Sequence, residues 1–378
     1  MKRLMALLMA LCMLVTGIAF AEEDEEYSLG DVVGEEALTA PEPEEEDEDS
    51  DVYFDEDTEA LLDDLHLDVE LDESVDPDKL DINPNLPDHV VNILLIGIDT
   101  RDTDLNEGLQ QGDVQLILSL NKQDGSVKLT SILRDLYVTI PGYKSKNRIN
   151  VAYARGDGQL AMRTVNKNFD MNIEYYATIN FYGLASIIDA IGGIDIELTK
   201  KEATAINSYL RKHPPKYDNT DGSARVELEK VDGVQHLDGV QAVMYARVRS
   251  IDNDFARSAR QRKLLELLLS KIMQDMTVDK LMSLIETSMP YVQTNVGLNT
   301  MLELALGLLQ GGIVQRAQAG ETLIDQHRIP VDETWKYYKT EGGASVVAFR
   351  TDKRKVENIQ ALHAFIYGEG AYYPAETK

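Results

Sequence analysis

The sequence predicts an α/β protein: a single three-layer domain with a central mixed β-sheet flanked by helices, preceded by a disordered acidic arm. Three observations support this. Short apolar runs are bounded by turn residues, helical patterns lie between them, and the charge changes abruptly near residue 87. Residues 22–86 hold 29 of the 66 acidic residues but one of the 37 lysines and arginines. The rest of the chain is therefore close to neutral, although the formal net charge is -29.

The first 21 residues are predicted to be a signal peptide or membrane anchor. Lys2 and Arg3 precede an uncharged apolar stretch that ends in Ala19-Phe20-Ala21, a typical cleavage sequence. The stretch is short for a membrane span, so a cleaved signal peptide is favoured. In both cases we expect an extracytoplasmic protein, secreted or anchored at the outer face of the cytoplasmic membrane. The single cysteine, Cys12, excludes an intramolecular disulfide and cysteine-based metal sites.

Residues 22–86 are predicted to form an acidic disordered linker, because a segment of such uniform charge repels itself and cannot bury a core. A short helix at residues 59–69 is the one regular element that its pattern allows. The linker could hold the domain away from an anionic surface or collect Ca²⁺ weakly, but a solvated tail is the simpler interpretation. Its charge argues against nucleic acid as a partner.

The main domain is predicted to span residues 87–320. Apolar runs at residues 90–98, 114–120 and 127–133 predict three buried strands, the last two joined as a hairpin. Residues 137–140 are expected to extend this sheet. Further strands are expected at 175–179 and 194–198, and helices at 158–169, 182–191, 202–210, 238–245, 255–273, 278–288 and 299–310. Residues 321–378 are predicted to be a C-terminal extension on or next to the domain, with strands near 322–329 and 345–350 and a helix near 355–367.

Aspartate and arginine gather at the predicted strand ends. No H-E-x-x-H, G-x-S-x-G, P-loop or Rossmann pattern is present. Asp99 and Arg101 follow the first strand, Asp113 precedes the second, and Arg134-Asp135 follows the third. Ligands bind at strand ends in open α/β sheets. Two carboxylates among guanidinium groups suit a metal ion bound to a phosphate, although ordinary surface ion pairs are the alternative.

A second cluster lies between residues 245 and 262, where five arginines occur. Arg247 and Arg249 share a face if the chain is extended there, and Arg257 and Gln261 share a face of the helix that follows. A basic solvated face and nucleic-acid contact are the alternatives. Because the export signal makes nucleic acid unsuitable, an anionic lipid pyrophosphate suits both clusters better.

These motifs, in this order, resemble the LytR-CpsA-Psr family of cell-envelope proteins, also described by the cell envelope-related transcriptional attenuator domain. The resemblance covers roughly residues 90–273. The matching segments are 92–101 (NILLIGIDTR), 112–113 (GD), 133–142 (LRDLYVTIPG), 148–154 (RINVAYA), 188–196 (IDAIGGIDI), 236–242 (HLDGVQA), 245–249 (YARVR), 254–255 (DF) with Arg257, and 260–261 (RQ).

The resemblance implies a phosphotransferase or ligase of mainly Gram-positive bacteria. Such an enzyme moves an anionic glycopolymer, of teichoic acid or capsule type, from undecaprenyl pyrophosphate onto peptidoglycan at the membrane surface, with possible pyrophosphatase side activity. It implies Mg²⁺ or Mn²⁺ held by Asp99 and Asp113. The implied pyrophosphate-binding residues are Arg101, Arg134, Asp135, Arg148, Arg247, Arg249 and Arg257. Catalysis is assigned to Arg134, Arg247, Arg249, Arg257 and Gln261, and Asp135 is expected to orient an arginine rather than act as a base.

The sequence departs from the family pattern at a few positions. Gln111-Gly112-Asp113-Val114 stands where the family often has a basic residue and then Ser-Asp-Thr, Arg148 replaces a lysine, and Ala256 replaces a glycine. A non-catalytic scaffold that binds polyprenyl phosphate is therefore the main alternative to an enzyme. A transcription regulator ranks third, because the chain carries an export signal and no DNA-binding motif.

Overall fold

The computed structural model describes the folded body in several segments. They are residues 75–98, 112–212, 226–248, 250–251, 254–275, 291–297, 300, 303–304, 307–308, 310–319, 321–340 and 342–375. The predicted signal segment, the predicted helices at 59–69 and 278–288, and most of the one at 299–310 lie outside these residues. Among the described helices, none combines the length and apolar character needed to span a membrane.

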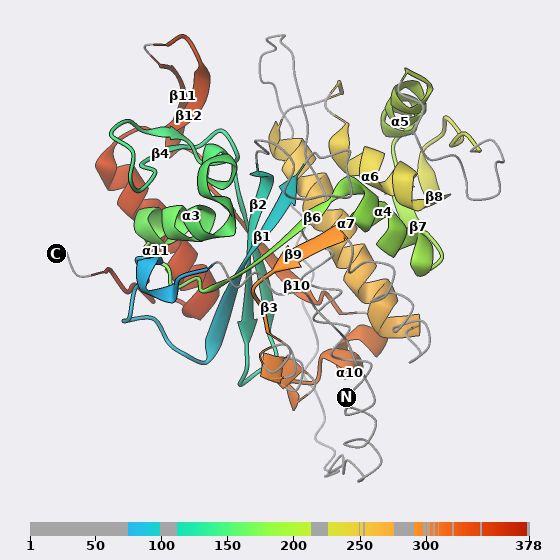
Figure 1. Cartoon of the computed structure of the whole chain (residues 1–378). Coiled ribbons are helices and arrows are strands. Elements are labelled where there is room, and N and C mark those ends of the chain that lie inside the picture. The colour runs from blue at the N-terminus through green and yellow to red at the C-terminus, as the bar shows by residue number, and fades with distance from the viewer. Residues whose placement is uncertain are drawn as a thin grey trace. The chain divides into compact units, whose positions relative to one another are not determined.

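A mixed six-stranded sheet forms the centre of the described body (Figure 1). Its strand order is β10 (Ile324–Ile329), β3 (Val127–Ile132), β2 (Gly112–Asn121), β1 (Val90–Ile98), β6 (Tyr175–Asn180) and β9 (Val292–Thr294). β2 is antiparallel to both β1 and β3, whereas β1 is parallel to β6 and β10 is parallel to β3. The carboxyl ends of β1, β3, β6 and β10 therefore share one edge with the start of β2.

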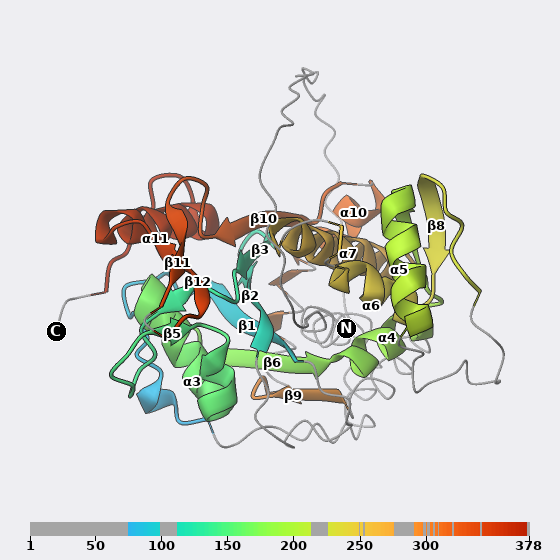
Figure 2. The same ribbon diagram turned by 90° about the horizontal axis from the view of Figure 1, so that it is seen from above.

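Helices cover both faces of the sheet, so the predicted three-layer α/β fold is confirmed (Figures 1 and 2). α3 (Val151–Phe169) and α11 (Asp352–Tyr367) lie on one side. The other side carries α4 (Phe181–Ala190), α5 (Lys200–Lys212), α6 (Gly239–Arg247), α7 (Asp254–Asp275) and α10 (Ile313–Gln318). β1 is apolar along most of its length because both of its faces are buried. Leu94 packs in the core cluster with Phe169 and Leu362, and the next residue, Leu95, is fully buried on the opposite face of the strand.

In the part of the chain that the structure describes, three short two-stranded sheets lie outside the central sheet. The prediction that residues 137–140 extend the main sheet is wrong: β4 (Tyr137–Val138) pairs with β5 (Asn147–Arg148) instead. β7 (Ile194–Leu198) pairs with β8 (Gly233–Leu237), and β11 (Trp335–Lys339) pairs with β12 (Ser345–Phe349). β8 and β11 were not expected, because polar or charged residues interrupt both sequences and Leu237 is the one residue of the two strands that is buried, which leaves no apolar run to detect.

Local sequence signals set several helix ends. The expected helix at 158–169 is the second part of α3, since Gly156 and Asp157 leave helical geometry and create a kink. Asn180 caps α4 by accepting a hydrogen bond from the Gly183 amide. Asp238 and Gln241 form a reciprocal capping box at the start of α6.

The first and last described segments of the body are joined. The Asn83 side-chain amide donates to the carbonyl oxygens of Tyr373 (2.7 Å) and Asp170 (2.9 Å), and Asn85 donates to Pro374 (3.2 Å). Leu80 is 1% exposed and packs in the core, so the folded body includes residues 75–86, which the sequence placed in the linker. Tyr373 also donates its amide N–H to Nδ1 of the buried His363 (3.1 Å).

Gly239 allows α6 to approach the backbone of α4. A Cβ atom at this position would lie 2.0 Å from the Ala185 carbonyl oxygen. We therefore expect Gly239→Ala to lower the free energy of unfolding by about 1–3 kcal/mol, because the two helices would have to separate. Urea denaturation measures this. Gly342→Ala is the control, since its Cβ would meet nothing closer than 3.9 Å; an equal loss in both variants would contradict the packing argument.

Two histidines should make stability depend on pH. Burial, with Arg262 and Arg328 nearby, lowers the pKa of His327 from 6.5 to about 4, and burial also lowers the pKa of His363. The unfolded chain would bind protons near pH 6.5, before the folded chain does. We therefore expect the free energy of unfolding to fall as the pH drops from 7.5 to 5. His327→Gln should make the free energy of unfolding, measured by urea denaturation, depend less steeply on pH, by a slope that corresponds to at most about one proton. A wild-type free energy of unfolding that does not change with pH would contradict this.

Candidate anion-binding site

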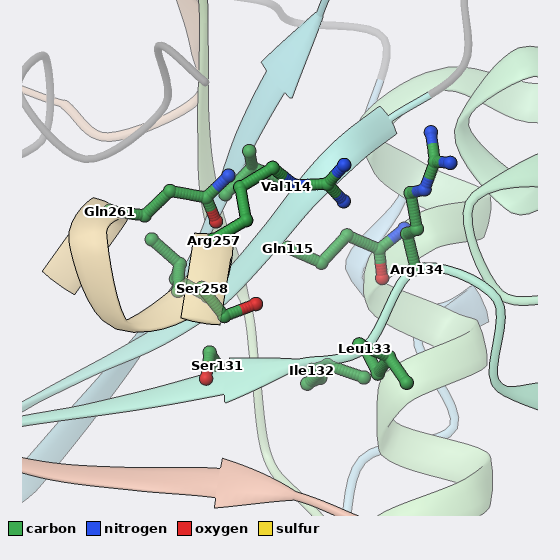
Figure 3. Close-up of a pocket in the computed structure, with 10 residues that line it drawn as sticks. Val114, Gln115, Ser131, Ile132, Leu133, Arg134, Arg257, Ser258 and Gln261 are labelled. Atoms are coloured by element: carbon green, nitrogen blue, oxygen red, sulfur yellow. The ribbon is translucent and has the colours of Figure 1, made fainter. Parts of the chain in front are cut away.

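A small pocket opens at the edge of the sheet where the strands end (Figure 3). The start of β2, the end of β3 and the first turns of α7 form its wall. Its lining residues are Val114, Gln115, Leu116, Ser131, Ile132, Leu133, Arg134, Arg257, Ser258 and Gln261. The pocket brings together three residues that the sequence separated into two clusters: Arg134 from the first, and Arg257 and Gln261 from the second.

Arg257 and Gln261 enter the pocket from α7. They are four residues apart, so they lie on one face of the helix, and Figure 3 shows both side chains directed toward β2. Arg257 is 2% exposed and Gln261 is 4% exposed. A guanidinium group removed from bulk water forms strong charge-assisted hydrogen bonds with an oxyanion. This wall of the pocket is therefore suited to phosphate.

Arg134 stands at the opposite side of the pocket, directly after β3. Its Nε lies 3.6 Å from an oxygen of Asp135, whose other oxygen lies 3.3 Å from Nε of Arg148. Asp135 thus contacts both arginines and limits how their side chains turn. Arg148 also donates to the Ser345 carbonyl oxygen (2.8 Å). The Asn150 amide donates to the Arg134 carbonyl, and the Asn150 carbonyl accepts from Gly112, which joins the ends of β2 and β3 (both 3.3 Å).

Arg247 reaches the same edge of the sheet from the end of α6, although it does not line the pocket. Its guanidinium carbon lies 3.8 Å from the ring centre of Phe181, the first residue of α4 after β6, and 5.7 Å from that of Tyr209. A guanidinium over an aromatic face is held by cation–π attraction. Phe181 was not singled out from the sequence, since an aromatic residue at a helix start carries no distinctive pattern.

Four of the sequence-predicted side chains fall outside the description: Asp99, Arg101, Arg249 and the side chain of Asp113. The backbone of Asp113 is described and is irregular. Gly97 pairs with Val114 and Ile98 pairs with Gly112, so β2 has one extra residue, Asp113, at this point. Such β-bulges redirect a side chain and are common beside active sites.

Gln115 is a pocket residue that the sequence reasoning missed. It is 1% exposed, and its amide nitrogen donates to the Ile149 carbonyl (3.3 Å). Its Oε1 accepts no hydrogen bond from the part of the chain that the structure describes, so the pocket offers a buried acceptor as well as cations. The sequence did carry a signal: a polar residue lies inside an apolar strand, and burial of a polar side chain costs free energy unless it is hydrogen-bonded.

A further arginine supports the pocket floor from outside. Arg262 donates to Oγ of Ser131 (2.7 Å) and to Gln326 (2.8 Å), and burial together with Arg328 lowers its pKa. Among the described residues, no group of three or more histidine, cysteine, aspartate or glutamate side chains could hold a metal ion. The described side chains of the pocket supply guanidinium, amide and hydroxyl groups, which are suited to an oxyanion.

Comparison with known proteins gives the family. The model of the LytR_cpsA_psr family matches residues 59–361, most of the chain. The chain belongs to this family. The resemblance inferred from the motifs is thus confirmed, and the match extends beyond the motif-bearing residues into the C-terminal part.

Individual relatives agree with this assignment. A protein of Enterococcus faecalis named polyisoprenyl-teichoic acid–peptidoglycan teichoic acid transferase TagU is 32% identical over 219 residues, covering 57% of this chain and 64% of that protein. The chain thus spans less than two thirds of this relative's length.

Two solved structures share the fold. TagT bound to LI-WTA has a TM-score of 0.54 at 22% identity, covering 77% of this chain and 92% of that one. The family protein YwtF (TagT) with bound octaprenyl pyrophosphate lipid has 0.51 at 20%, covering 74% and 91%.

The pocket should bind an oxyanion through Arg257. We expect Arg257→Ala to weaken binding of inorganic pyrophosphate about 10-fold or more, because a buried charge-assisted hydrogen bond is lost. The affinity of Arg257→Lys should lie between those of the wild type and Arg257→Ala, since lysine keeps the charge but not the planar guanidinium group. Isothermal titration calorimetry measures the affinity. Arg354→Ala, which removes an exposed cation paired with Glu357, is the control; equal weakening by that variant would contradict a specific site.

Proposed function

We propose that this protein is an extracytoplasmic phosphotransferase that moves a polyprenyl-pyrophosphate-linked anionic glycopolymer onto peptidoglycan. The observation that carries the proposal is the pocket in which Arg134 and Arg257 lie on opposite sides of buried Gln115. The family membership and the name of the Enterococcus faecalis relative support the reaction class. The octaprenyl pyrophosphate in a related structure supports the donor class.

The geometry suits phosphoryl transfer because that chemistry depends on positioning and charge neutralisation. Arg257 would bind the pyrophosphate oxygens from α7, and Arg134 would bind them from the end of β3. Asp135 would keep Arg134 and Arg148 oriented toward the same ligand. Arg247, held over Phe181, and Arg101 and Arg249 are assigned to the same pyrophosphate. Gln261 would assist Arg257 with a neutral amide, which adds a hydrogen bond without adding charge.

A divalent cation, Mg²⁺ or Mn²⁺, is part of the proposal. Carboxylate oxygens are suitable ligands for such ions, and Asp99 and Asp113 are the assigned ligands. Support comes from the backbone pairing of Ile98 with Gly112, each the chain neighbour of one of these aspartates. When bound, the cation would neutralise charge on the pyrophosphate and so favour departure of the lipid phosphate.

The proposed reaction requires a place and two partners. The donor is an undecaprenyl-pyrophosphate-linked polysaccharide at the membrane surface, and the acceptor is peptidoglycan. A protein acting on both must lie outside the cytoplasm, which agrees with the basic and apolar N-terminal residues.

Phosphate release from polyprenyl pyrophosphate tests this proposal. We expect the full chain to release phosphate with Mg²⁺ but not with EDTA. Asp99→Ala and Arg134→Ala should each reduce the rate at least about 100-fold. The first removes a ligand of the proposed cation and the second removes a guanidinium, so that both variants lose positive charge at the pyrophosphate in the transition state. Arg354→Ala should match the wild type.

A second assay follows transfer of labelled glycopolymer to purified peptidoglycan. Lipid binding without phosphate release and without transfer would contradict the enzyme and support a polyprenyl-phosphate-binding scaffold.

A further inference from the structure

The β11–β12 hairpin exposes aromatic and basic side chains together. We define the hairpin surface as Trp335, Lys336, Tyr337, Tyr338 and Lys339, the residues of β11. Tyr337 is 66% exposed and Tyr338 is 42% exposed. Trp335, the only tryptophan in the chain, packs edge-on against Tyr337 with ring centres 5.2 Å apart. Large aromatic side chains left in water commonly mark a binding surface.

The hairpin contacts residues next to the pocket that Arg134 and Arg257 line, which we call the arginine pocket. The Val347 amide of β12 donates to the Asp135 carbonyl (2.9 Å), and Arg148 donates to the Ser345 carbonyl (2.8 Å). Asp135 is the carboxylate that contacts Arg134 and Arg148. Figures 1 and 2 both place β11 and β12 beside the β4–β5 segment, at the same end of the body.

Aromatic contacts continue from the pocket to the hairpin on two sides. Phe255, two residues before Arg257 on α7, lies 4.8 Å from Trp335 between ring centres. Tyr137, three residues after Arg134, lies 6.2 Å from Tyr338. A ligand held at its phosphate end by Arg134 and Arg257 would therefore meet aromatic rings as it leaves the pocket.

We propose that the hairpin surface binds the saccharide chain of an anionic glycopolymer whose pyrophosphate end occupies the arginine pocket. This rests on the proposed function and adds a subsite for the polymer itself. Aromatic rings pack against the apolar C–H faces of sugars. Lys336 and Lys339 would attract the phosphate or carboxylate groups that lie between the sugars of the polymer. The combination suits a polymer that has both chemical features along its length.

The hairpin is less suited to an anionic membrane surface. Its turn, residues 340–344, has the sequence Thr-Glu-Gly-Gly-Ala, which carries a negative charge and no large apolar residue. A hairpin that enters a bilayer would place its apolar side chains at the tip. Here the aromatic residues lie along the strand instead: Trp335, Tyr337 and Lys339 share one face of β11, and Lys336 and Tyr338 share the other.

Fluorescence of the single tryptophan provides the test. The full-length protein is titrated with lipid-free poly(glycerol phosphate) teichoic acid. We expect the polymer to change Trp335 emission at saturation, and Tyr337→Ala to raise the apparent Kd at least 5-fold. Lys336→Ala should reduce the salt dependence of binding. Tyr372→Ala, which removes another partly exposed tyrosine on the C-terminal segment, should bind like the wild type. Circular dichroism confirms that each variant is folded.

The outcomes separate this inference from the proposed function. Wild-type protein that releases phosphate from polyprenyl pyrophosphate but shows no response to the polymer overturns the hairpin subsite alone. Binding that Tyr337→Ala leaves unchanged also overturns it. A response to phosphatidylglycerol vesicles but not to the polymer would make the hairpin a membrane contact instead. Protein that binds the polymer through Tyr337 but releases no phosphate would overturn only the proposed enzymatic function.

Discussion

The antiparallel pairing of β2 with both β1 and β3 determines where chemistry is possible in this protein. Because β2 runs opposite to its neighbours, its first residues meet the last residues of β1 and β3 at one edge. Residues far apart in the chain thereby become neighbours: Gln115 from the start of β2 and Arg134 from beyond β3 line one pocket. α7 closes that pocket with Arg257. Without this register, the arginines would be ordinary surface cations, whose ion pairs contribute little free energy because water screens them.

Much of the fold could be predicted from the sequence, because the strands that build the core are continuous apolar runs. β1 was expected at residues 90–98, which are its observed bounds, and its runs of valine, leucine and isoleucine leave no alternative for burial. β8 and β11 were not expected, since exposed strands in small sheets bury too few side chains to leave a pattern. β4 was assigned to the wrong sheet, because strand partners depend on contacts that no local pattern records.

The candidate site was predictable in its charges but not in its neutral parts. Arg134 and Arg257 stood out because clustered arginines require counter-charge, and the structure places both in the pocket. Gln115 and Phe181 did not stand out, since one lies in an apolar strand and the other at the start of a helix. Their roles depend on what faces them in three dimensions: an open pocket for Gln115 and the Arg247 guanidinium for Phe181.

The hydrogen bonds of Asn83 and Asn85 have a mechanical consequence. They fasten the first described segment of the body to residues 373 and 374 and to the end of α3, at the edge of the sheet where β1 begins. From Val90 to Ile96, the residue that pairs with Gln115 of the pocket, β1 spans about 20 Å. Tension applied through the chain before residue 75 would load the two Asp76–Gln159 hydrogen bonds first (2.6 and 2.9 Å) and the bonds of Asn83 and Asn85 after them. All of these contacts lie before β1, so the pocket would keep its shape while the body is pulled.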